Sequence, residues 1–214
     1  MKRLLVVGSL AIVTGSLTAC ASAPVRYYTL QSPAAATAAE SETPVAFHIE
    51  VLPVGLPAQL DQSFLVVRQG DNGVAIRDTA RWASPYEDEL RQALSTELTH
   101  RLGTTDVGGL PTPKGTDVLR IKLQVRRFDA WPDRQVELEA DWSLGFANDR
   151  ERPSLTCHGT FSAPAKRGDT ALVDAERGLV QALALRMAAD ARGLAYADRP
   201  SCSADRANER GRRS

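Results

Sequence analysis

Apolar and polar residues alternate strictly in two consecutive segments near the middle of the chain. Residues 119–126 and 136–146 each place an apolar side chain at every second position, and Pro132-Asp133 lies in the turn between them. A period of two puts one face of a strand in a core and the other in water. The pattern predicts an antiparallel pair, which a third strand at 155–161 extends into a meander.

A tight turn in this pair would set its register through opposed charges. Arg126 would then face Glu137, and Lys122 would face Asp141. Pairs of this kind contribute about 0.2–1 kcal/mol each and help to fix which residues lie opposite one another.

Another strand and a hairpin are predicted earlier in the chain. The segment 47–57 has strand character up to its prolines, and the β-rich runs 64–69 and 74–78 flank the sequence Gly-Asp-Asn-Gly at 70–73. Asn-Gly between two such runs is a strong hairpin signal.

The first of two predicted helices has start and stop signals. Ser84 is placed to cap it, Pro85 suits its first position and Glu87 completes a capping box. Apolar residues then recur at every fourth position until Gly103, which ends the helix.

A second amphipathic helix is predicted at about 171–193. Asp169 or Thr170 is placed to cap it, and Gly193 is expected to stop it. A sheet with one wet face, covered on the other face by two amphipathic helices, indicates a two-layer α+β domain. Its sheet is expected to be mainly antiparallel, built from the hairpin and the three-strand meander.

The first twenty residues have the layout of a secretory signal. Lys2 and Arg3 precede the apolar stretch 4–17, which is too short to span a bilayer, since a span needs about 20 apolar residues. The sequence Leu-Thr-Ala-Cys that ends at Cys20 resembles the bacterial lipobox. In that motif the signal is cut before the cysteine and the thiol is acylated. The alternative is an ordinary cleaved signal with a chance cysteine.

Lipidation of Cys20 would anchor the protein to a membrane, because stable anchoring takes two or more acyl chains. The lipobox rule is that an aspartate directly after the cysteine retains a lipoprotein at the inner membrane. Ala21 stands there instead. We therefore predict the periplasmic leaflet of the outer membrane, with the covalent lipid at Cys20 and no other cofactor.

Composition divides the chain into four parts. Residues 1–19 form the signal peptide, and 20–44 form a lipidated amino terminus and flexible linker, rich in alanine, serine, threonine and proline. Residues 45–197 form the folded domain. The arginine-rich polar tail is 198–214.

Charge and motif content argue against several functions. Lysine plus arginine equals aspartate plus glutamate, 26 of each, and no basic binding face suggests nucleic acid. The three histidines lie on separate elements without metal-ligand spacing, so no metal site is expected. Neither a nucleophile elbow nor a zinc-protease or phosphate-loop motif occurs, so no catalytic residue is expected.

Two cysteines remain after Cys20. An oxidising periplasm favours a disulfide between Cys157 and Cys202, which would tie the tail to the third meander strand. The alternative is that Cys157 is a small buried hydrophobe and Cys202 lies loose. His158 would point away from its neighbour Cys157 on a strand, so the two would not act as a nucleophile pair.

Several motifs in order resemble the ABC-type transport auxiliary lipoproteins. They are the lipobox, then YYTL at 27–30, VLPVGLPAQLDQSFLVVR at 51–68 and RWASPYEDELRQAL at 81–94. The resemblance covers nearly the whole mature chain and depends on the order and spacing of the motifs.

The resemblance implies a non-enzymatic role in lipid trafficking. Family members are outer-membrane lipoproteins that work with a membrane-anchored MCE-domain protein, whose rings stack into a tunnel across the periplasm. They are thought to dock at the outer end of that tunnel as a ring-shaped homo-oligomer. An alternative is a lipoprotein that serves another outer-membrane assembly machine or ties the membrane to the envelope.

Four aromatic and basic residues are candidates for contact with lipid or a partner. Tyr27 and Tyr28 would line the lipid face, anchor an edge strand on a partner, or cover the domain's own core. Arg81 and Trp82 would contact the tunnel protein, or Trp82 would cap the core from a loop.

Overall fold

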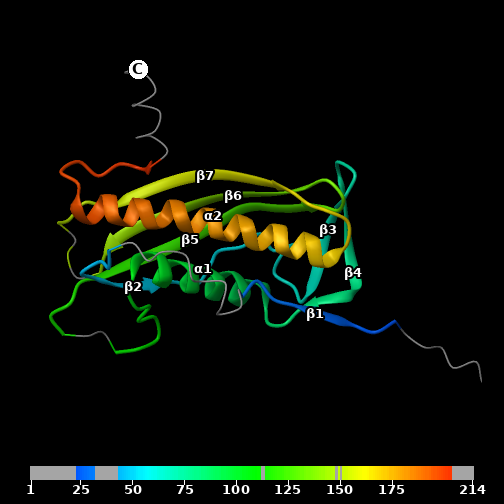
Figure 1. Cartoon of the computed structure of the whole chain (residues 1–214), viewed down its shortest axis with the longest axis horizontal. Helices are drawn as coiled ribbons and strands as arrows, with labels where there is room; N and C mark the ends of the chain where they lie inside the picture. The colour runs from blue at the N-terminus through cyan, green and yellow to red at the C-terminus, as the bar shows by residue number, and fades with distance from the viewer. Residues whose placement is uncertain (1–22, 32–42, 112–113, 148, 150, 204–214) are drawn as a thin grey trace, which may run out of the picture.

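The computed structural model describes residues 23–31, 43–111, 114–147, 149 and 151–203. In this part of the chain two sheets and two helices form an α+β domain, and the predicted fold class is confirmed. Figure 1 shows the helices stacked on one face of the larger sheet, with the smaller sheet at one end.

The larger sheet contains the predicted meander. Every second residue of β6 (Gln135–Phe146) is buried, which is the alternation that the sequence displays. The meander strands are antiparallel, whereas the short β2 (His48–Val51) joins β5 (Val118–Trp131) in parallel. In spatial order the strands are β2 (His48–Val51), β5 (Val118–Trp131), β6 (Gln135–Phe146) and β7 (Leu155–Pro164).

Two helices cover the apolar face of this sheet. The longer helix, α2 (Asp169–Tyr196), packs on β5, β6 and β7, and α1 (Tyr86–Leu102) packs on α2 and β2 (Figure 1). The core between the layers includes Trp142 of β6, which is almost fully buried. None of the described helices is both long and apolar enough to cross a membrane.

The helix ends differ from prediction in three places. One is the start of α2, where Gly168 takes the cap position and Asp169 is already the first helical residue. Pro85, not Ser84, occupies the cap position of α1, and the Ser84 hydroxyl donates to Glu89 rather than joining a capping box with Glu87. Gly103 ends α1 in the left-handed conformation, as predicted. The predicted stop at Gly193 is wrong, because the helix continues to Tyr196.

The predicted register of the meander is also wrong. Lys122 lies opposite Ser143, because β5 runs on to Trp131, which pairs with Gln135, and the bulge after Val125 takes back one residue of the resulting shift. The turn therefore closes later, through Asp133 with a left-handed φ of 61°. Arginine-to-carboxylate attraction across the pair is kept with other partners: Arg126 pairs with Asp141 at 2.6 Å, and Arg127 with Glu137 at 3.2 Å.

The predicted hairpin belongs to a separate three-stranded sheet. Its strands β3 (Phe64–Gln69) and β4 (Gly73–Trp82) are antiparallel, and β1 (Arg26–Tyr28) pairs with the end of β4 in parallel. The three-stranded sheet lies at the end of the molecule opposite the end of α2 (Figure 1).

The prediction that the folded domain begins at Val45 is therefore wrong. Residues 26–31 belong to the domain, since β1 pairs with β4 and Leu30 is 1% exposed. A strand of three residues is too short to show a period, and the alanine-rich segment after it suggested a linker. The middle of that segment, 32–42, lies outside the described residues.

Candidate functional site

The YYTL segment is fastened to the start of α1 by a buried carboxylate. Glu89, 3% exposed, accepts hydrogen bonds from the Thr29 hydroxyl at 2.7 Å and the Leu30 N–H at 2.9 Å. It also accepts from the Ser84 N–H at 3.1 Å and the Ser84 hydroxyl at 2.7 Å. One side chain thus joins the amino-terminal segment, the end of β4 and the first helix.

Replacing Glu89 with alanine is expected to destabilise the protein by roughly 3 kcal/mol. The change leaves the buried Leu30 N–H without its partner and removes bonds to a charged acceptor. Chemical denaturation measures the effect, and proteolysis before α1 should become faster.

Glu87→Ala is the matched control, because Glu87 is the neighbour that a capping box would use. We expect it to change the free energy of unfolding by no more than about 0.5 kcal/mol. A larger effect at Glu87 than at Glu89 would contradict the observed arrangement.

The two tyrosines of β1 face different surroundings. Tyr28 packs partly against the core, and its carbonyl accepts a hydrogen bond from the Ala83 N–H at 2.8 Å. Tyr27 is 66% exposed and lies opposite Arg81 in the sheet. Of the two, Tyr27 is the residue that the fold presents to an outside surface.

Arg81 and Trp82 also lie in different surroundings. Trp82 is 5% exposed and lies 4.8 Å from the Tyr86 ring, so it belongs to the core at the end of a strand, not to a loop. The Arg81 guanidinium lies 4.5 Å over the Phe64 ring. Arg81 remains a candidate contact residue, whereas Trp82 does not.

A buried acid lies behind Trp82. Glu176 of α2 accepts a hydrogen bond from the Tyr86 hydroxyl at 3.4 Å, beside a cavity of about 10 Å³ that Trp82 and Phe128 help to line. Burial raises the pKa of Glu176 from 4.5 to about 8, although the Tyr86 bond acts in the opposite direction. Burial and the nearby Glu176 charge raise the pKa of Tyr86 well above 10.0.

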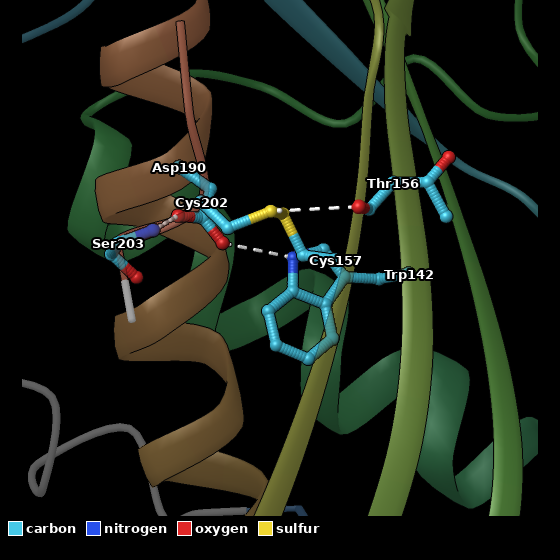
Figure 2. The surroundings of a disulfide bond; sticks show 6 residues. All are labelled: Trp142, Thr156, Cys157, Asp190, Cys202 and Ser203. Atoms are coloured by element: carbon cyan, nitrogen blue, oxygen red, sulfur yellow. Dashed lines mark hydrogen bonds between the residues drawn. A yellow bond between two sulfur atoms is a disulfide. The ribbon is translucent and has the colours of Figure 1, made fainter. Parts of the chain in front are cut away.

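The far end of the molecule is closed covalently. Cys157 of β7 and Cys202 form a disulfide, with their Cα atoms 5.8 Å apart. Figure 2 shows the Trp142 indole beside it, where Nε1 donates to Asp190 at 3.0 Å. The Ser203 N–H also donates to Asp190, so the first residues of the predicted tail lie against the domain. Residues 204–214 lie outside the described part.

Comparison with protein families decides what kind of chain this is. A model of the ABC-type transport auxiliary lipoprotein component matches residues 28–188, which span nearly all of the described fold. The chain belongs to this family. The match begins within β1, in agreement with the domain boundary that the structure gives. A comparison with curated proteins gave no match.

Solved structures similar to this auxiliary lipoprotein support the fold. An uncharacterized protein has 19% identity and a TM-score of 0.61, with 78% of this chain and 98% of that chain covered. Protein XCC0632 from Xanthomonas campestris has 16% identity and a TM-score of 0.56, with 80% and 94% covered. A minor lipoprotein from Acinetobacter baumannii has a TM-score of 0.30, too low to carry an argument.

Oppositely charged side chains pair with one another on the solvent-exposed face of the larger sheet of the auxiliary lipoprotein. Arg120 pairs with Glu50 at 2.6 Å, and Asp141 contacts His158 at 2.7 Å as well as Arg126. The hydrogen bonds from His158 and Arg126 lower the pKa of Asp141. Because the charges are balanced, this face does not form the basic surface that nucleic acid would need.

Within the described residues, the auxiliary lipoprotein shows no group of side chains suited to a metal ion. Cys157 is consumed by the disulfide, and exposed His158 points to the other face of β7. Sequence analysis missed the buried acids Glu89 and Glu176. The position of Glu176 in the sequence could have revealed it, since Glu176 lies four residues after Leu172 and three before Leu179, within the apolar stripe of α2.

Proposed function

We propose that this chain is a non-enzymatic outer-membrane lipoprotein that docks the periplasmic tunnel of an MCE-type lipid transport system to the outer membrane. The family match over 28–188 is the observation that carries the proposal. The position of Cys20, directly after an apolar signal and shortly before the first strand, supports it. Cys20 itself lies outside the described residues.

The physical need for such a piece follows from lipid solubility. A phospholipid with two chains of about 16 carbons would cost roughly 25 kcal/mol to strip into water, at about 0.8 kcal/mol per methylene. Lipid therefore travels in a shielded conduit, and that conduit has to be held at the membrane where it ends. Holding it requires an anchor and a binding surface, with no bond made or broken.

Capture of the MCE-domain protein tests the docking role. The full lipidated chain, extracted in a mild detergent, is expected to retain that protein, identified by mass spectrometry as an MCE-domain sequence. Binding as a ring-shaped homo-oligomer predicts that the captured complex contains several copies of the chain. Recovery of a different assembly machine, with no MCE-domain protein, would favour the alternative role in envelope assembly.

Replacing Cys20 with serine is expected to move the protein from the membrane fraction to the soluble periplasm. A hydroxyl at this position does not take the acyl chains that anchor the protein. Fractionation and incorporation of radioactive palmitate measure the outcome. A Cys20→Ser protein that still pellets with membranes, together with an unlabelled wild type, would contradict the lipoprotein assignment.

Sorting between the two membranes has its own test. Ala21→Asp is expected to move the acylated protein to the inner-membrane fraction, because aspartate at that position acts as a retention signal in the lipobox rule. Ala21→Ser is the matched control and should leave the protein in the outer membrane. An unchanged distribution of the Ala21→Asp protein would count against sorting by this residue.

A further inference from the structure

One face of the three-stranded sheet carries apolar side chains and arginines. This outer face is the one opposite the buried Leu65 and Val67, and half or more of the Tyr27 and Ile76 side chains is exposed on it. Val74 beside them is likewise exposed. The outer face consists of Tyr27, Phe64, Val66, Arg68, Val74, Ile76 and Arg81.

The strand register shows that these residues form one continuous surface. Tyr27 of β1 lies opposite Arg81 of β4, and Arg81 lies opposite Phe64 of β3. Residues that lie opposite one another share a face. The irregularity between Phe64 and Leu65 then lets Val66 and Ile76 continue the same face toward the hairpin turn.

One arginine of this surface has no ion pair with a described carboxylate. Arg81 lies over Phe64. Arg68 differs, since it pairs with Asp129 at 3.6 Å. Arg26 of β1 lies opposite the buried Ala80 and so belongs to the other face of the sheet. The outer face therefore offers the positive charge of Arg81 next to apolar side chains.

The short length of chain between Cys20 and β1 indicates that this face lies near the membrane. Five residues separate Cys20 from Arg26, so a fully extended tether reaches roughly 20 Å at about 3.3–3.6 Å per residue. The headgroup layer of one leaflet takes up about 5–8 Å of that distance. If Cys20 is acylated, the three-stranded sheet is held close to the membrane surface and cannot stand away from it on a long linker.

We propose that the outer face of the three-stranded sheet lies on the phospholipid headgroups of the leaflet that holds the anchor. Tyr27, Val74 and Ile76 enter the interfacial layer, where aromatic and apolar groups are stable beside polar ones. Arg81 contacts lipid phosphates, while its aliphatic stem stays on apolar surface. The proposal rests on the acylation of Cys20 and adds a fixed orientation of the domain on the bilayer.

Fluorescence quenching from the lipid phase tests this orientation. The full, acylated chain carrying Ile76→Cys is labelled with an environment-sensitive fluorophore and placed in vesicles of phosphatidylethanolamine and phosphatidylglycerol. The new thiol is the one free for labelling, because Cys157 and Cys202 are bonded and Cys20 is acylated. The matched control is Leu185→Cys on α2, since Leu185 is 54% exposed and Ile76 50%.

We expect nitroxides attached near the lipid headgroups to quench the label at 76 at least threefold more than the label at 185. Equal quenching at the two positions would overturn the proposal. Burial of position 76 from lipid and aqueous quenchers alike would also overturn it, and would assign the face to a second copy or to the tunnel protein.

A charge-reversal variant separates this proposal from the lipid anchor itself. Arg81→Glu with Ile76→Glu is expected to stay in the membrane pellet, because the acyl chains remain, but to lose protection of Tyr27 from a water-soluble tyrosine-modifying reagent. Unchanged protection would overturn the membrane contact while leaving acylation intact. A chain that takes up no palmitate and leaves the membrane would instead overturn the anchor.

Discussion

Raising the pH from about 5 to about 9 is expected to lower the free energy of unfolding by roughly 3–4 kcal/mol. The cause is Glu176, whose pKa is raised by burial from 4.5 to about 8. A carboxyl with a raised pKa in the folded state contributes its full stability below 4.5 and loses it as the pH rises through 8. The window lies between these two values, and urea denaturation across it measures the loss.

The matched variant for this prediction is Glu176→Gln. Glutamine keeps the size and the acceptor for the Tyr86 hydroxyl but does not ionise. The pH dependence should therefore flatten between about 5 and 9, and at pH 8 the variant should be more stable than the wild type by roughly 4 kcal/mol. Asp141, whose pKa is lowered, titrates below this window. An unchanged slope in the variant would assign the effect to another group.

Loss of the Cys157–Cys202 bond is expected to destabilise the domain by about 3–4 kcal/mol. The bond closes a loop across a sequence separation of 45 residues, and a cross-link of that length restricts the unfolded chain by about this amount. For a chain of this size the melting temperature should fall by about 10 °C. Thermal melts with and without reductant measure the difference.

Cys202→Ser provides the control for reduction. This variant should melt where reduced wild type melts and should not respond to reductant. Freed of its bond, the end of the chain would also leave Asp190, which then loses its hydrogen bond from the Ser203 N–H. A count of two reactive thiols in unreduced mature protein would contradict the bond.

Elements with a long, regular pattern were predictable from the sequence. Alternation through β5 and β6 gave the meander, and Asn-Gly gave the hairpin, because each signal depends on local geometry. The register was not predictable, since the pairing begins at Trp131 opposite Gln135 and shifts at the bulge after Val125, and neither feature changes the alternation of β6. Helix α2 passes Gly193 because residues beyond it, such as Leu194, are buried and continue the packing.

Candidate contact residues were harder to separate than elements. Tyr27 and Tyr28 are adjacent and identical in type, and only the pairing of β1 with β4 shows which one is exposed. Trp82 appeared to lie in a loop because the bulge in β4 hides the end of the strand. The buried carboxylates were missed because charge in a helix suggests solvent, whereas their hydrogen bonds come from segments about 60 and 90 residues away in sequence.

The disulfide lies at the end of the molecule opposite the three-stranded sheet, and helix α2 separates these two ends (Figure 1). Helix α2 has 28 residues, so it runs about 42 Å at 1.5 Å per residue between those two ends. A passenger protein fused after Ser203, the last described residue, would therefore start from the cross-linked end. If β1 lies at the membrane surface, energy transfer from the fused protein to a lipid dye would measure how far the cross-linked end lies from the bilayer.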